Sequence, residues 1–139
     1  MPLDPHLLRA SFDLAVTNQP ELTARFYEIL FERYPQVKPL FGRNSNANQA
    51  NMLQGALVAV MDHLDDATWL ADTLTAMGKK HVDYGVTDEM FDWVGASLLA
   101  ALAEAAGDRW TPEVEAAWIE AYGAIAGLMQ QGARDARAA

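Results

Sequence analysis

Residues 22–35, LTARFYEILFERYP, decide the fold class of this chain. At the angular step of an α-helix, the apolar side chains fall on two separate faces. One face carries Leu22, Phe26, Ile29 and Leu30, and the other carries Tyr27, Phe31 and Tyr34. A helix that is apolar on two sides packs between two partners. We therefore expect a helix from Pro20 that Pro35 ends, in the middle of an all-helical fold.

The rest of the chain is also predicted to be helical. Apolar residues at helical spacing predict helices over about residues 4–16, 49–64, 67–80, 87–106 and 111–131, with a short segment over 35–41. No run alternates apolar and polar residues as a strand would. Gly132 is the expected end of the last helix, so residues 1–131 form the domain and 132–139 a flexible tail. The fold class is all-α, with about six long helices and a short one.

Composition excludes several classes of function. The 139 residues fit one domain, and 10 Lys and Arg against 19 Asp and Glu give a net charge of −9. Such an acidic chain repels nucleic acid and anionic membranes. The absence of cysteine excludes disulfides, thiolate metal sites and cysteine nucleophiles. We see no signal peptide and no apolar run near the ~18 residues of a spanning helix, so we expect a soluble, cytoplasmic protein.

A few polar residues lie on apolar helix faces, and each allows two interpretations. His81 continues the stripe of Leu70, Leu74 and Met77, so it either caps the end of its helix or projects into the core as a metal or haem ligand. His63, in the last turn of its own helix, is open to the same alternatives.

Three further residues could line a pocket. Gln49 borders the apolar stripe that begins at Leu53, so it either faces water or aims its amide into a pocket. Tyr27 is either a core tyrosine bound to backbone or a pocket donor, and Phe41 is either core packing or a pocket wall.

Taken together, these residues resemble the bacterial globins, above all the single-domain bacterial haemoglobins and the haem domain of flavohaemoglobins. The likeness covers residues 22–129 and rests on the stretches LTARFYEILFERYP (22–35), KPLF (38–41), QANML (49–53), MGKKHVDYGV (77–86), WVGASLLAAL (93–102) and WTPEVEAAWIEAYG (110–123). It implies a globin fold around a pocket for haem b.

The resemblance also implies roles for individual residues. His81 would be the proximal ligand of the haem iron, and Phe41 would pack on the haem plane. Tyr27 and Gln49 would donate hydrogen bonds to bound dioxygen on the distal side, beside an apolar wall at Leu53. Arg43, Lys79 and Lys80 are close enough in sequence to pair with a haem propionate, or they are solvated surface charges.

Two positions depart from the flavohaemoglobin pattern. Flavohaemoglobins carry a tyrosine ten residues after the proximal histidine, where this sequence has Phe91. They also carry a glutamate late in the last helix, at a position that falls near Ala133 here. Neither side chain accepts a hydrogen bond, which leaves the proton of the His81 imidazole to a backbone carbonyl. This favours an oxygen-binding globin over one tuned to redox turnover.

Four functions follow from the resemblance. The first is reversible binding of dioxygen by a monomer or homodimer. The second is nitric oxide dioxygenation, which makes the protein an enzyme that needs an external reductase as electron donor. The third is gas sensing, which needs an output partner. The fourth, a globin that has lost haem and binds other proteins, is disfavoured by the intact set of Tyr27, Phe41, Gln49 and His81.

Overall fold

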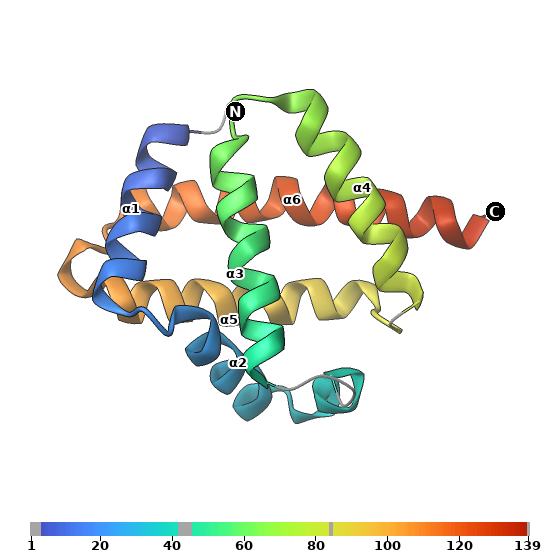
Figure 1. Cartoon of the computed structure of the whole chain (residues 1–139), viewed down its shortest axis with the longest axis horizontal. Coiled ribbons are helices and arrows are strands. Elements are labelled where there is room, and N and C mark those ends of the chain that lie inside the picture. Colours follow the sequence, from blue (N-terminus) through green and yellow to red (C-terminus); the bar gives the residue numbers. More distant parts are fainter. Residues whose placement is uncertain (1–3, 42–45, 84, 139) are drawn as a thin grey trace.

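The structure, a computed structural model, describes residues 4–41, 46–83 and 85–138, and these residues contain helices and turns but no strand. Six α-helices follow one another, with two short 3₁₀ segments between them (Figure 1). They are α1 (Pro5–Asn18), α2 (Leu22–Arg33), η1 (Pro35–Phe41), α3 (Asn46–Asp62), α4 (Ala67–Asp83), α5 (Asp88–Ala106), η2 (Gly107–Arg109) and α6 (Pro112–Ala138). The predicted class of six long helices and a short one is confirmed; the turn η2 was not expected.

Local sequence explains where these helices begin and end. The Asp4 carboxylate accepts a hydrogen bond from the backbone N–H of Leu7 at 3.1 Å and so caps α1. The Thr111 hydroxyl accepts from the N–H of Val114 at 3.2 Å at the start of α6. Helix α2 ends before Pro35, and α5 ends at Gly107, whose φ of +58° suits glycine.

Helix α2 has the two apolar faces that its sequence predicts. Its first face is buried, with Leu22, Phe26, Ile29 and Leu30 each at most 5% exposed. The second face, with Tyr27, Phe31 and Tyr34, is half-buried against the same core. Because α5 packs on one side of α2 and α3 on another, both faces have a partner.

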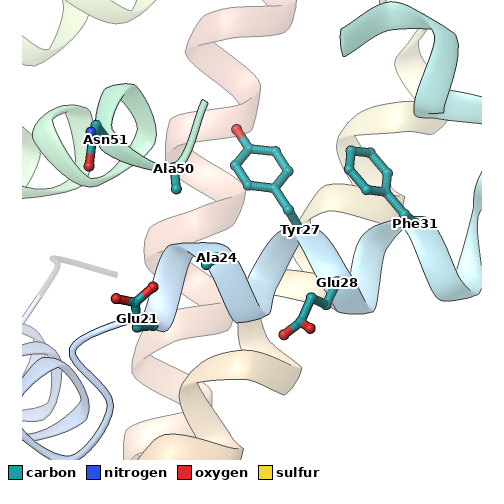
Figure 2. A pocket seen from close by; sticks show the side chains of 7 residues that line it. All are labelled: Glu21, Ala24, Tyr27, Glu28, Phe31, Ala50 and Asn51. Carbon is teal, nitrogen blue, oxygen red and sulfur yellow. The ribbon is translucent and has the colours of Figure 1, made fainter. Parts of the chain in front are cut away.

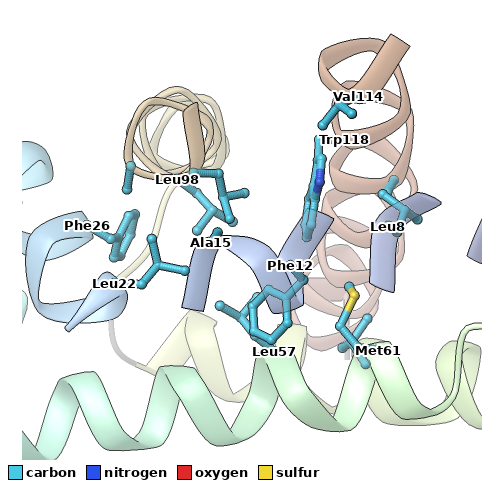
Figure 3. Close-up of a cluster of buried hydrophobic side chains, with 14 of the residues drawn as sticks. Leu8, Phe12, Ala15, Leu22, Phe26, Leu57, Met61, Leu98, Val114 and Trp118 are labelled. Carbon is cyan, nitrogen blue, oxygen red and sulfur yellow. The ribbon is translucent and has the colours of Figure 1, made fainter. Parts of the chain in front are cut away.

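The core joins helices that are distant in the sequence. Leu8, Phe12 and Ala15 of α1 meet Leu57 and Met61 of α3 and Trp118 of α6 (Figure 3). The indole N–H of Trp118 donates to the Ser11 hydroxyl at 2.8 Å, which satisfies a polar group that is otherwise buried in this core.

The most extensive helix contact joins α4 to α6, which cross at two glycines (Figure 1). A Cβ on Gly78 would lie 1.9 Å from the carbonyl oxygen of Met129, and a Cβ on Gly132 would lie 2.0 Å from that of Thr75. A side chain at either position would force the two helix backbones apart. The prediction that Gly132 ends the last helix is therefore wrong, because this glycine permits a close crossing and α6 continues to Ala138. The expected tail is helical over residues 132–138, and Ala133 is 2% exposed.

One helix, covering residues 88–109 with α5 and η2, is long and apolar enough to cross a membrane by length and composition alone. It packs against α1, α2 and α6. The face formed by Phe91, Leu98 and Leu102 is buried in these contacts. It is therefore a core helix of the fold.

Candidate ligand-binding site

His81 lies near the C-terminal end of α4, with its ring partly buried. Its Nδ1 atom is 2.6 Å from the carbonyl oxygen of Met77, one turn earlier. A carbonyl can only accept, so Nδ1 carries the proton, and the lone pair of the neutral ring is on Nε2. The bond orients the ring and selects the tautomer that binds a metal through Nε2. It also confirms the expectation that the imidazole proton goes to a backbone carbonyl.

His63 provides a comparison within the same chain. Its Nδ1 is 2.7 Å from the carbonyl oxygen of Ala59, again one turn earlier. Its ring, however, stacks on Trp69 with centroids 3.8 Å apart and planes 9° from parallel. The ring of His81 lies beside that of Phe91, tilted by 34° with the centroids 6.5 Å apart. The two histidines therefore make the same kind of hydrogen bond to the backbone one turn earlier, but their aromatic neighbours differ.

A tyrosine of α6 fixes the part of α5 that faces His81. The Tyr122 hydroxyl donates to the carbonyl oxygen of Phe91 at 2.5 Å. Its ring covers Gly95, where a Cβ would lie 2.5 Å from the nearest ring carbon. Burial and the nearby carboxylate of Asp92 raise the pKa of Tyr122, so the phenol stays protonated. This bond could not be predicted from the sequence, because no local pattern pairs Tyr122 with Phe91, 31 residues away.

Tyr27 projects from α2 toward the beginning of α3 (Figure 2). Its ring meets the edge of Phe26 at 4.8 Å and stacks on Phe31 at 5.8 Å. Burial raises the pKa of the Tyr27 hydroxyl to about 12, which keeps the proton on this hydroxyl at physiological pH. Tyr27 lines a cavity of about 480 Å³ together with Ala50 and Asn51 of α3, the neighbours of Gln49 in the sequence.

The remaining predicted residues have different positions. Leu53 lies on α3, half-buried against the core, and Lys80 is exposed on α4 directly before His81. Phe41 ends η1 and Gln49 lies in the first turn of α3, but their side chains are outside the described residues, as is the whole of Arg43.

Comparison with known proteins decides the family. Residues 24–129 match the family model described as Globin. The chain belongs to the globin family. The flavohemoprotein of Rhodopirellula baltica is 37% identical over 117 residues, which are 83% of this globin and 29% of the relative. The flavohemoprotein of Chromobacterium violaceum is 34% identical over 122 residues, which are 86% of this globin and 30% of the relative. This globin therefore spans about a third or less of the curated relatives it matches.

Two solved structures agree with the fold. An engineered carbene transferase made from a candidate nitric oxide dioxygenase of Rhodothermus marinus superposes with a TM-score of 0.84 at 28% identity, covering 96% of this globin and 93% of that chain. A bacterial globin from Campylobacter jejuni gives 0.82 at 25% identity and covers 97% of both chains. The predicted globin fold is confirmed.

Membership of this family implies a haem cofactor, and the described residues fit one. The donor is a histidine whose Nδ1–H is held by backbone, which leaves Nε2 as the coordinating atom. It lies on a helix fixed by the close crossing of α4 with α6. The ring of Phe91 in α5 supplies an apolar neighbour to the His81 ring, with centroids 6.5 Å apart.

Proposed function

We propose that this globin holds haem b through His81 and binds dioxygen reversibly. The observation that carries the proposal is the 2.6 Å bond from Nδ1 of His81 to the Met77 carbonyl, which prepares Nε2 as a metal ligand. Haem, when bound, supplies an iron centre that takes diatomic gases.

Tyr27 and Gln49 are the proposed hydrogen-bond donors to the gas. A tyrosine hydroxyl at its ordinary pKa of about 10 is already protonated at physiological pH, and burial raises the pKa of Tyr27 further, to about 12, so it can donate throughout this range. One neutral donor contributes on the order of 1 kcal/mol, and two shielded donors slow ligand release by about tenfold or more. Leu53 would form the apolar wall beside the gas, and Phe41 would pack on the haem plane. Lys80 and Arg43 would pair with the haem propionates.

The surroundings of His81 favour reversible binding over redox turnover. Its N–H is held by a neutral carbonyl, which makes the imidazole less basic than a carboxylate partner would. Phe91 offers only a ring, and the Tyr122 hydroxyl donates to the backbone of Phe91. A carboxylate partner would make the imidazole more electron-rich and so favour the ferric state, whereas a neutral carbonyl partner favours the ferrous state.

The first experiment compares absorption spectra of wild type, His81→Ala and His63→Ala, ferric and then reduced under air. His63 is a matched control because its Nδ1 makes the same bond to a carbonyl one turn earlier. We expect a Soret band and a stable oxygenated spectrum in wild type and His63→Ala, and loss of both in His81→Ala. A wild type that binds no haem even with added hemin would refute the proposal.

The second candidate function is nitric oxide dioxygenation, favoured by the 37% identity to a flavohemoprotein. In this reaction dioxygen, nitric oxide and one electron would give nitrate, with the bound haem supplying the redox centre and an external reductase supplying the electron for each turnover. Stopped-flow mixing of the oxygenated protein with nitric oxide, followed by addition of a cell extract and NADH, tests it. Rapid return of the ferrous form would support enzymatic turnover, whereas a lasting ferric form would leave gas binding as the function.

A further inference from the structure

The cavity beside Tyr27 is much larger than a diatomic gas requires. Its volume is about 480 Å³, whereas a small molecule such as water occupies about 30 Å³ in its liquid. It is half-open to solvent and lies between α2 and the first turns of α3 (Figure 2). The lining residues are Glu21, Ala24, Tyr27, Glu28, Phe31, Ala50 and Asn51. A cavity that is open outside and reaches the proposed distal donor has the form of an entrance.

Small side chains keep this space open. Ala24 of α2 and Ala50 of α3 contribute only methyl groups from the two helices that flank the cavity (Figure 2). The ring of Tyr27 stands next to them, with its hydroxyl directed toward α3. A branched side chain at either alanine would occupy space that the cavity now leaves open.

The rim of the cavity is acidic. Glu21 and Glu28 are seven residues apart, two helical turns, so they lie on the same side of α2. The described lining contains no cation. Arg25 approaches Glu28 at 3.8 Å, but its guanidinium is held by Glu104 at 2.9 Å, and that pairing raises the pKa of Arg25. The charge of Arg25 is therefore shared between two carboxylates, and the rim stays negative in a chain of net charge −9.

We propose that neutral diatomic gases reach the distal side of this globin between α2 and α3, past Ala24 and Ala50, and that Glu21 and Glu28 select against anions at this entrance. The inference rests on the proposed haem site. A negative rim leaves the approach of dioxygen, nitric oxide and carbon monoxide unchanged. It raises the energy of an approaching azide or nitrite ion over about one Debye length, roughly 10 Å at 0.1 M salt.

The steric part is tested by carbon monoxide rebinding after flash photolysis in the haem-loaded protein. We expect Ala24→Leu and Ala50→Leu to slow bimolecular association by about threefold or more and to increase the fraction that rebinds before escape. Ala10→Leu, an exposed site on α1, is the size-matched control and should match wild type. Where a leucine variant fails to retain haem, Ala24→Val gives a smaller obstruction of the same kind. Wild-type rates in haem-loaded variants would overturn the route.

The electrostatic part is tested by azide binding to the ferric protein, followed by visible absorption. Glu21→Gln combined with Glu28→Gln should accelerate azide association by about two- to fivefold at low salt, and leave carbon monoxide unaffected. The gain should vanish near 1 M salt, where the Debye length is about 3 Å. Asp72→Asn combined with Glu113→Gln removes the same charge from exposed sites outside the cavity lining. Equal acceleration in this control would overturn the role of the rim.

Absence of a His81-dependent Soret band would refute the haem site itself. A normal Soret band with association rates that none of the cavity variants change would refute only the entrance.

Discussion

Replacing Gly78 by alanine tests whether the close crossing of α4 and α6 positions His81. A Cβ at Gly78 would lie 1.9 Å from the Met129 carbonyl oxygen, whereas real Cβ atoms essentially never approach within 3.0 Å of another heavy atom. The two backbones must therefore separate by about 1 Å, because neither partner is a flexible side chain. Overpacking of this kind costs about 1–3 kcal/mol or more, which exceeds the ~1 kcal/mol that alanine gains over glycine in a helix.

Gly127 supplies the matched control for this substitution. It lies in the same α6, and a Cβ there would meet nothing within 4 Å. Gly127→Ala should therefore raise the free energy of unfolding by up to about 1 kcal/mol, while Gly78→Ala lowers it by about 1–3 kcal/mol. Thermal unfolding should show midpoints that move in opposite directions, by about 3 °C per kcal/mol.

The second readout of Gly78→Ala concerns the ligand helix. Gly78 precedes His81 by one turn, so a displaced α4 carries the imidazole with it. We expect haem to transfer to excess apomyoglobin faster from Gly78→Ala than from Gly127→Ala. Equal stability and equal haem transfer in the two variants would refute the reasoning.

Three further predictions concern other parts of the chain. Ser11→Ala leaves the buried indole N–H of Trp118 without its acceptor, and urea unfolding should show a loss of about 1–3 kcal/mol in the free energy of unfolding. The loss should be smaller in a Trp118→Phe background, because the donor is then absent. Gly107→Ala should lower the free energy of unfolding by about 1–2 kcal/mol, whereas Gly127→Ala should not lower it. A Cβ meets no obstacle at either glycine, but of these two only Gly107 has a positive φ, of 58°, which strains an alanine backbone. Burial raises the pKa of Tyr27 to about 12 from an unfolded value near 10. Its contribution to stability is therefore complete below pH 10 and is lost as the pH rises from 10 to 12. Tyr27→Phe should flatten this part of a plot of the free energy of unfolding against pH.

Much of this fold could be predicted from local pattern. The two faces of α2 and the start of α6 at Thr111 depend on neighbours in the sequence, and both are confirmed. The acceptor for His81 was also predictable, because the residue one turn earlier always presents a carbonyl. These features share one property: each follows from the spacing of residues within a few turns of the chain.

What could not be predicted depends on contacts between distant segments. A glycine that ends a helix and a glycine at a helix crossing look alike in sequence, so Gly132 was misread. The bond from Tyr122 to the Phe91 carbonyl spans 31 residues and leaves no local signal. The cavity beside Tyr27 depends on two alanines that sequence patterns read as ordinary helix formers.

The corrected end of α6 changes how the departure at Ala133 is understood. From the sequence, this position was expected to fall in a flexible tail over residues 132–139. In the structure Ala133 is 2% exposed within α6, beside the glycine that meets α4. A buried position selects its occupant by volume and polarity, and an unpaired carboxylate there would be costly. Ala133 is therefore a buried apolar position of α6, next to the crossing with α4. The same crossing holds the turn of α4 that carries the Met77 carbonyl, the acceptor for His81, so the packing of these helices bears on the proposed preference for reversible gas binding.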